Sequence, residues 1–167
     1  MLALIKVQIM LLLILMLESP GSMPDGRVKT ISDGLREHTG IGAAIFVTLV
    51  GVLSILHRYA AFNTLATLLV WVALVGFIGM LYYPNTKQNA HTLYATMTLV
   101  APLLLQTQLL IEGKYSLLMG TVPAWLVLAA VGLSFVMWPE ATGILEIVYV
   151  SLLWFSWSCF HKAGPGI

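Results

Sequence analysis

Six long apolar runs constrain the fold of this chain more than any other feature of its sequence. A helix crosses the hydrocarbon core of a membrane with about 20 apolar residues, because it rises about 1.5 Å per residue through a core about 30 Å thick. The runs do not alternate between apolar and polar residues as the strands of a membrane barrel do. We therefore predict an all-helical, up-and-down bundle with six membrane spans, at residues 2–17, 39–56, 63–83, 92–111, 116–138 and 144–160.

The composition supports a membrane location and excludes several other classes of protein. Hydrophobic residues make up 59% of the 167 residues, whereas charged residues make up only 9%. A soluble domain averages about 25% charged residues, and this chain cannot supply the charged exterior that water requires. The formal net charge of +1 offers no basic surface for nucleic acid, so we expect no nucleic-acid partner. The single cysteine, Cys159, cannot form an internal disulfide.

The polar breaks between the runs determine the expected connectivity. Every loop after the first is shorter than about ten residues, and short loops make consecutive helices antiparallel neighbours. The sequence thus predicts one transmembrane domain over residues 1–167, with Ser32 or Asp33 as the N-cap of the helix at 39–56. With six spans, four Lys and Arg residues fall on each side of the membrane, so positive charge does not decide the orientation. Most acidic residues fall opposite the termini, which favours cytoplasmic termini.

The first apolar run has two interpretations, a retained helix and a cleaved secretory signal. Lys6, an apolar core and the polar break at Glu18 are typical of a signal peptide. However, no small-x-small cleavage pattern precedes the break, and Pro20 and Pro24 crowd that region. These features favour the retained helix.

A polar stripe follows one face of the span at 92–111. Its members are spaced by three or four residues, which places them on one helix face: His91, Ala95, Thr98, Pro102 and Gln106. Polar groups are costly at membrane depth, so the stripe should face the interior of the bundle. It is either a small polar pocket or path, or a set of hydrogen bonds to neighbouring helices. We favour the hydrogen bonds, because no charged residue joins Thr98 and Gln106 on the stripe.

Small residues form a second pattern, on the span at 63–83. Ala73, Gly76 and Gly79 occupy every third position, and small residues allow two membrane helices to approach closely. We expect this seam to pack against the span at 39–56, through Gly40 and Ala44.

Glu146 is an acidic residue about one turn inside the last predicted span. A carboxylate near a helix N-terminus is stabilised by the helix dipole and can reach the lipid headgroups. An acid inside a membrane is also a default candidate for a proton carrier or for the partner of a cation. The sequence leaves both interpretations open.

The four histidines raise the alternative of a membrane cytochrome that holds haem b. In the predicted topology His38 and His91 lie on one side of the membrane, and His57 and His161 lie on the other. All four lie near span ends, and no Cys-x-x-Cys-His or His-Glu-x-x-His motif is present. We therefore predict no cofactor and no metal site, with haem b as the alternative. A small proton-coupled carrier that uses the polar stripe is a second alternative.

The order of the polar motifs resembles that of a known family. The segments that carry the resemblance are Thr30-Ile31-Ser32-Asp33-Gly34, Tyr83-Pro84, His91-Thr92-Leu93-Tyr94-Ala95, Thr142-Gly143-Ile144-Leu145-Glu146-Ile147 and Leu152-Leu153-Trp154. Over nearly its whole length the chain resembles the bacterial and archaeal six-helix membrane family catalogued as domain of unknown function 998, which is similar in plan to the DRAM-like membrane proteins. The resemblance implies a prokaryotic cell membrane and no known activity. It marks Ser32, Asp33, His91 and Glu146 as the patterned polar positions.

These observations lead to one functional hypothesis. We expect a non-enzymatic membrane protein with a polar cluster on the membrane face opposite its termini, formed by Ser32, Asp33, His38, His91 and Glu146. The cluster would bind a lipid headgroup or a small ligand, or the protein would serve as a subunit of a larger membrane assembly. The expected partners are membrane lipids, other membrane subunits or a second copy of the chain.

Overall fold

Seven helices make up the regular structure of the part of this protein that the structure describes. The computed structural model describes residues 2–18, 30–60, 63–83, 88–113, 118–137 and 142–163, and within these ranges it contains helices and no strand. The helices are α1 (Leu2–Glu18), α2 (Ile31–Glu37), α3 (Thr39–Ala60), α4 (Thr64–Tyr82), α5 (Gln88–Ile111), α6 (Leu118–Met137) and α7 (Thr142–Ala163). The all-helical prediction is confirmed, and each predicted apolar run coincides with a helix. The short helix α2 was not predicted.

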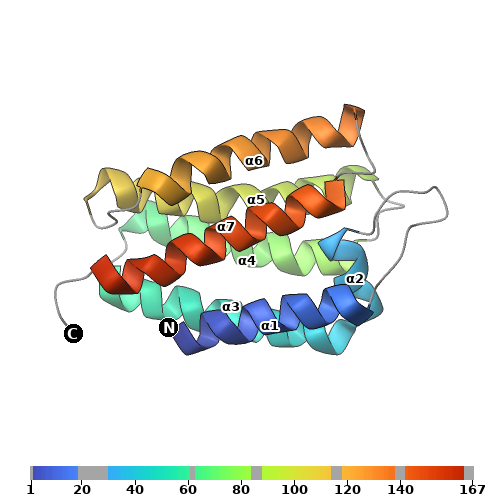
Figure 1. Cartoon of the computed structure of the whole chain (residues 1–167), viewed down its shortest axis with the longest axis horizontal. Helices are drawn as coiled ribbons and strands as arrows, with labels where there is room; N and C mark the ends of the chain where they lie inside the picture. The colour runs from blue at the N-terminus through green and yellow to red at the C-terminus, as the bar shows by residue number, and fades with distance from the viewer. Residues whose placement is uncertain are drawn as a thin grey trace.

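The six long helices lie roughly side by side, with α2 at one end of the bundle (Figure 1). The start of α1 and the end of α7 lie at the opposite end (Figure 1). The most extensive packing joins α4 to α5, followed by α6 to α7 and α1 to α3. Helix α2 contacts α1, α3, α4 and α7, so it crosses one end of the bundle rather than extending along it.

Three helices in the described part of the chain are long and apolar enough to cross a membrane. These segments are Thr39–Arg58, Thr64–Tyr82 and Asn89–Ile111, and shorter apolar helical segments cover Ala3–Leu15, Thr121–Ser134 and Thr142–Trp157. The outer face of α4 illustrates their surface, since five large apolar side chains there are 49% to 62% exposed: Leu65, Leu68, Trp71, Val75 and Ile78. A continuous apolar face of this kind is suited to contact with lipid.

The local sequence explains why α2 forms a separate helix. Thr30 is its N-cap, and Asp33 completes a capping box in which each side chain binds the backbone amide of the other. Ser32 and Asp33 therefore lie within α2, and the prediction that one of them caps the helix at 39–56 is wrong. His38 ends α2 and alone separates it from α3.

The glycine seam of α4 packs against α5, so the predicted contact with the 39–56 helix is also wrong. A Cβ atom built on Gly76 would lie 2.8 Å from the backbone nitrogen of Thr98, and one built on Gly79 would overlap the ring of Tyr94. A Cβ atom on Gly40 of α3 would meet nothing within 4 Å. The glycines thus allow the backbones of α4 and α5, which are consecutive in the chain, to approach closely.

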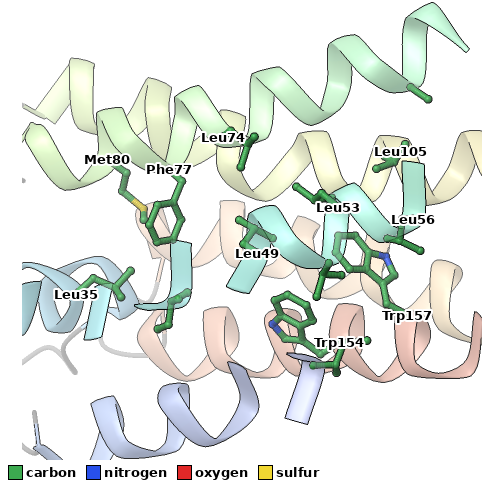
Figure 2. Close-up of a cluster of buried hydrophobic side chains, with 14 of the residues drawn as sticks. Leu35, Leu49, Leu53, Leu56, Leu74, Phe77, Met80, Leu105, Trp154 and Trp157 are labelled. Atoms are coloured by element: carbon green, nitrogen blue, oxygen red, sulfur yellow. The ribbon is translucent and has the colours of Figure 1, made fainter. Parts of the chain in front are cut away.

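The main hydrophobic core joins α3, α4, α5 and α7, and buried residues of α1 and α2 also belong to it. Figure 2 shows its side chains, with α3 and α4 facing the two tryptophans of α7, and the labelled residues are Leu35, Leu49, Leu53, Leu56, Leu74, Phe77, Met80, Leu105, Trp154 and Trp157. Trp154 and Trp157 meet edge to face, with their ring centroids 5.4 Å apart. A second cluster, between α5, α6 and α7, contains Leu103, Ala124, Val131, Tyr149 and Leu153.

Candidate functional site

The polar cluster begins at the first turn of α2. Thr30 and Asp33 are 7% and 6% exposed, and three hydrogen bonds join them. The Thr30 hydroxyl donates to Oδ2 of Asp33 over 2.7 Å, and the Thr30 amide donates to the same oxygen over 3.0 Å. The Asp33 amide in turn donates to the Thr30 hydroxyl over 3.3 Å. These bonds satisfy backbone donors that would otherwise have no partner inside a short helix.

Ser32 connects this capping box to His91 on α5. Its hydroxyl lies 2.9 Å from Oγ1 of Thr30 and 3.2 Å from Nε2 of His91. The other ring nitrogen, Nδ1 of His91, lies 2.9 Å from the carbonyl oxygen of Tyr83, at the end of α4. The ring of Tyr83 is stacked on that of Tyr94, with centroids 5.3 Å apart, which helps to hold this carbonyl in place. His91 therefore links α2, α4 and α5.

Glu146 connects the same helix to α7. Its Oε2 accepts a hydrogen bond from the backbone amide of Ile31 over 3.1 Å, and the residue is 7% exposed. Ile31 is the first residue of α2, where the amides point out of the helix and the dipole is positive. The carboxylate thus stabilises the start of α2 in addition to lying near the start of its own helix.

A cavity of about 100 Å³ lies inside the bundle, next to the cluster. Ser32 of α2 and Glu146 of α7 line it, whereas most of its wall is apolar and includes Leu49, Phe77, Leu153, Trp154 and Trp157. Figure 2 shows several of these side chains, among them Leu49, Phe77 and the two tryptophans. From Glu146 to Trp157 the wall follows three turns of α7, a distance of about 16 Å. The cavity is therefore apolar along α7, with its charged group at the α2 end.

The remaining polar side chains of the wall bond to backbone carbonyls. The Thr98 hydroxyl donates to the carbonyl oxygen of Tyr94 in the preceding turn over 2.9 Å. The Tyr149 hydroxyl donates to the carbonyl oxygen of Leu99, next to Pro102. Pro102 lacks the amide that would bond to the carbonyl of Thr98, and Tyr149 adds a donor from α7 to the carbonyl of the next residue, Leu99. Both hydroxyls therefore serve the backbone, and the middle of the cavity presents mainly apolar atoms.

The polar stripe of α5 divides between two environments. Ala95, Thr98 and Pro102 line the cavity, and His91 belongs to the cluster. Gln106 is 1% exposed, and its Nε2 donates to Oγ1 of Thr121 on α6 over 2.9 Å. At about 100° per residue, Gln106 is rotated about 60° from His91 around the helix, which turns it toward another neighbour. One part of the stripe thus borders a cavity, whereas Gln106 forms a hydrogen bond to a neighbouring helix.

The structure brings together four of the five residues predicted for the cluster. Hydrogen bonds join Ser32, Asp33 and His91 through Thr30, and Glu146 reaches the same turn through Ile31. His38 lies at the other end of α2 and is half-buried. Among the described residues, no hydrogen bond connects its imidazole to the cluster.

Several site residues were not predicted from the sequence. Thr30 had a recognisable signal, because Thr-x-x-Asp before a helix is typical of a capping box. Tyr149, Leu153 and Trp157 follow Glu146 at intervals of three and four residues, which places them on one face of α7. That periodicity indicated a shared face but could not show that a cavity lies against it.

The histidines on which the haem alternative depends lie in different surroundings. Both ring nitrogens of His91 lie within hydrogen-bond distance of protein atoms, so an iron ligand there would have to displace one of them. His57 is exposed on α3, and the side chain of His161 lies outside the described residues. No group of three or more His, Cys, Asp or Glu side chains suited to a metal ion occurs among the described residues. The haem alternative stays a prediction, and a visible absorption spectrum of the purified protein would test it.

Comparisons with known proteins identify no relative: no family model, no curated protein and no solved structure matches this chain. The resemblance to the six-helix family therefore stays a prediction. The functional argument rests on the cluster and on the cavity beside it.

Proposed function

We propose that this chain is an integral membrane protein with six spans, α1 and α3 to α7, that binds a single-chain amphiphile from the surrounding membrane. The length and apolar character of α3, α4 and α5 support the membrane location, as do the shorter apolar segments of α1, α6 and α7. In this arrangement the short helix α2 lies at one membrane face, beside the polar cluster. Membrane lipids are the source of the ligand.

The observation that carries the proposal is the uneven distribution of polarity along the cavity. Its apolar wall favours a hydrocarbon chain, since burial of apolar surface contributes about 25 cal/mol per Å². The cavity volume of about 100 Å³ has room for a short segment of such a chain, and the rest of the chain would extend beyond it. For comparison, an apolar cavity of about 150 Å³ in another protein stays dry and accepts benzene. Ser32 and Glu146 would meet the polar head at the α2 end.

The chemistry of that end selects the kind of head group. Among the described residues, Asp33 and Glu146 place two carboxyl groups at the first turn of α2. Carboxylates repel a carboxylate or phosphate and attract hydrogen-bond donors. Since the polar side chains that line this end, Ser32 and Glu146, carry oxygens that accept hydrogen bonds, we assign the site to a long-chain molecule with a hydroxyl or amine head rather than to a fatty acid.

Tryptophan fluorescence tests whether a ligand enters the cavity. Variants in detergent micelles would retain only Trp154, which lines the cavity, or only Trp71, which is 62% exposed on the outer face of α4. The probe is a brominated long-chain alcohol, because bromine quenches indole on contact. We expect saturable quenching of Trp154 and a gradual, unsaturated decrease for Trp71. Equal, unsaturated curves for both variants would contradict the proposal.

A cavity-filling pair of variants supplies the matched control. Ala95 lines the cavity, whereas Ala129 is exposed on α6. Ala95→Phe should abolish the saturable quenching of Trp154, and Ala129→Phe should leave it unchanged. A brominated fatty acid serves as the head-group control, with quenching expected at higher concentration than for the alcohol. Stronger binding of the acid would reject the assigned head group.

A further inference from the structure

A continuous chain of hydrogen-bond contacts connects the carbonyl of Tyr83 to the carboxylate of Asp33. It runs from the Tyr83 oxygen to Nδ1 of His91, from Nε2 of His91 to Oγ of Ser32, from Ser32 to Oγ1 of Thr30, and from Thr30 to Oδ2 of Asp33. The four distances are 2.9, 3.2, 2.9 and 2.7 Å. All four side chains are at most 9% exposed.

The number of hydrogens decides how many of these contacts are hydrogen bonds. A carbonyl only accepts, so Nδ1 of His91 carries a proton. If Asp33 is ionised, the Thr30 hydroxyl donates to it, and Ser32 must donate to Thr30. Nε2 of His91 must then donate to Ser32, which requires the doubly protonated imidazolium. If His91 is neutral, then His91, Ser32 and Thr30 together supply only three hydrogens for the four contacts.

We propose that one proton held on the chain from His91 through Ser32 and Thr30 to Asp33 completes a hydrogen-bonded lock that holds α2 over the α2 end of the cavity, and that loss of this proton weakens the lock by about one hydrogen bond. Without the proton, either the Ser32–His91 contact or the Ser32–Thr30 contact has no hydrogen. Ser32 lines the cavity, and so do Ile31 and Leu35 of the same helix. The lock therefore holds the helix that covers this end of the proposed binding site.

Two acidic side chains contact the turn of α2 that this chain of contacts reaches. Asp33 lies at the other end of the chain, and Glu146 reaches the same turn of α2 from α7. The carbonyl oxygen of Tyr83, at the end of α4, faces Nδ1 of His91. The described charged residues farther along α2, Arg36 and Glu37, are exposed, and the half-buried His38 follows them. The lock is complete while both ring nitrogens of His91 carry a proton, and it is weaker by one hydrogen bond when the ring is neutral.

The first test measures the protonation of His91 without any ligand. Nitrogen-15 spectra of histidine-labelled protein distinguish an imidazolium from a neutral ring, and the signal of His91 is assigned with His91→Gln. Over about pH 5 to 8, the range in which histidines commonly titrate, we expect two bound protons at low pH and a change at Nε2 as the pH rises. A His91 ring that stays neutral across the range would overturn the proposal.

The second test measures the lock through hydrogen exchange of the α2 amides, corrected for the intrinsic effect of pH. We expect protection of residues 32–37 to fall about tenfold as the pH rises, the effect of losing about one hydrogen bond. His91→Gln and Ser32→Ala should each remove this pH dependence. Ser54→Ala, at an exposed serine of α3, and His57→Gln should retain it. Thr30→Ser keeps both the hydroxyl and the N-cap, so it should also behave as the original protein does.

These measurements separate the lock from the proposed ligand, on which its functional role rests. If α2 shows the pH-dependent protection but the brominated alcohol never quenches Trp154, the ligand proposal fails and the lock stands. If the alcohol binds and α2 protection has the same pH profile in His91→Gln, the lock fails. If both hold, association of the alcohol should be faster at high pH, and Ser32→Ala should make it fast at every pH.

Discussion

Oε2 of Glu146 accepts a hydrogen bond from the backbone amide of Ile31 over 3.1 Å, although 115 residues separate the two in the chain. This bond joins the first turn of α2 to α7 and places a carboxylate at the positive end of a short helix. The same side chain lines the cavity. Glu146 therefore has a structural role that can be measured apart from any ligand.

Replacement of Glu146 should loosen α2. Glu146→Ala leaves the partly buried amide of Ile31 without this acceptor, and we expect a loss of about 1–3 kcal/mol in the free energy of unfolding. Glu146→Gln retains an acceptor oxygen and should cost less. Thermal unfolding in detergent, followed by circular dichroism, provides the measurement. Glu112→Ala is the control, because Glu112 is exposed and bonds to Asn63 at the surface. Equal losses at positions 146 and 112 would contradict this account.

The seam between α4 and α5 should not tolerate a methyl group. In Gly79→Ala the new Cβ atom meets the ring of Tyr94, which is itself stacked on Tyr83 and has little freedom to move. Overpacking of this kind costs about 1–3 kcal/mol. Gly132→Ala on α6 meets nothing within 4 Å, so it should be neutral or stabilising. A comparison of the unfolding temperatures of the two variants tests the seam, and a lower temperature for Gly132→Ala would count against it.

Gln8→Met should cost little stability although Gln8 is fully buried. The Oε1 atom of Gln8 has no hydrogen-bond partner within the described residues, while its Nε2 donates to the carbonyl oxygen of Ile45. That carbonyl also accepts from the hydroxyl of Thr48, so it keeps a side-chain partner in the variant. Methionine fills a similar volume. We expect a change in the free energy of unfolding within about 1 kcal/mol, whereas Gln8→Ala should cost about 2 kcal/mol or more because it leaves a cavity. A large loss in Gln8→Met would show that the polar group stabilises the protein.

Tyr149→Phe should destabilise the helix pair α5 and α7. The variant removes one hydrogen bond to the Leu99 carbonyl, and the loss of a typical buried hydrogen bond costs about 0.5–1.5 kcal/mol. Tyr82→Phe, at a residue that is 77% exposed, should have no effect. Chemical or thermal unfolding of both variants gives the comparison. Unchanged stability in Tyr149→Phe would mean that the carbonyl finds another donor.

Helix α1 should be present in the mature protein. Ile5, Gln8 and Leu15 are at most 3% exposed, and α1 packs along α3. Removal of residues 2–17 as a signal peptide would expose the side chains that these residues cover. The intact mass of protein purified from membranes should therefore include this segment. A mass that corresponds to cleavage near Glu18 would support the signal-peptide interpretation instead.

The sequence by itself determined where helices form, because length, hydropathy and capping motifs act within one segment. The run at 63–83 and the helix Thr64–Tyr82 agree for this reason. Thr30 and Asp33 could likewise have been recognised as a capping box, since that motif spans four residues.

Only the tertiary structure decided which of these faces meet. The seam of Gly76 and Gly79 could have served any neighbour, and it packs on α5. Periodicity placed His91 and Gln106 on one stripe, whereas their partners lie on α2 and α6 respectively. Hydropathy shows which side of a helix avoids water or lipid, but in an apolar bundle many neighbours would satisfy that requirement. The choice depends on steric fit and on hydrogen bonds between distant segments, such as Ile31 and Glu146, which no local pattern contains.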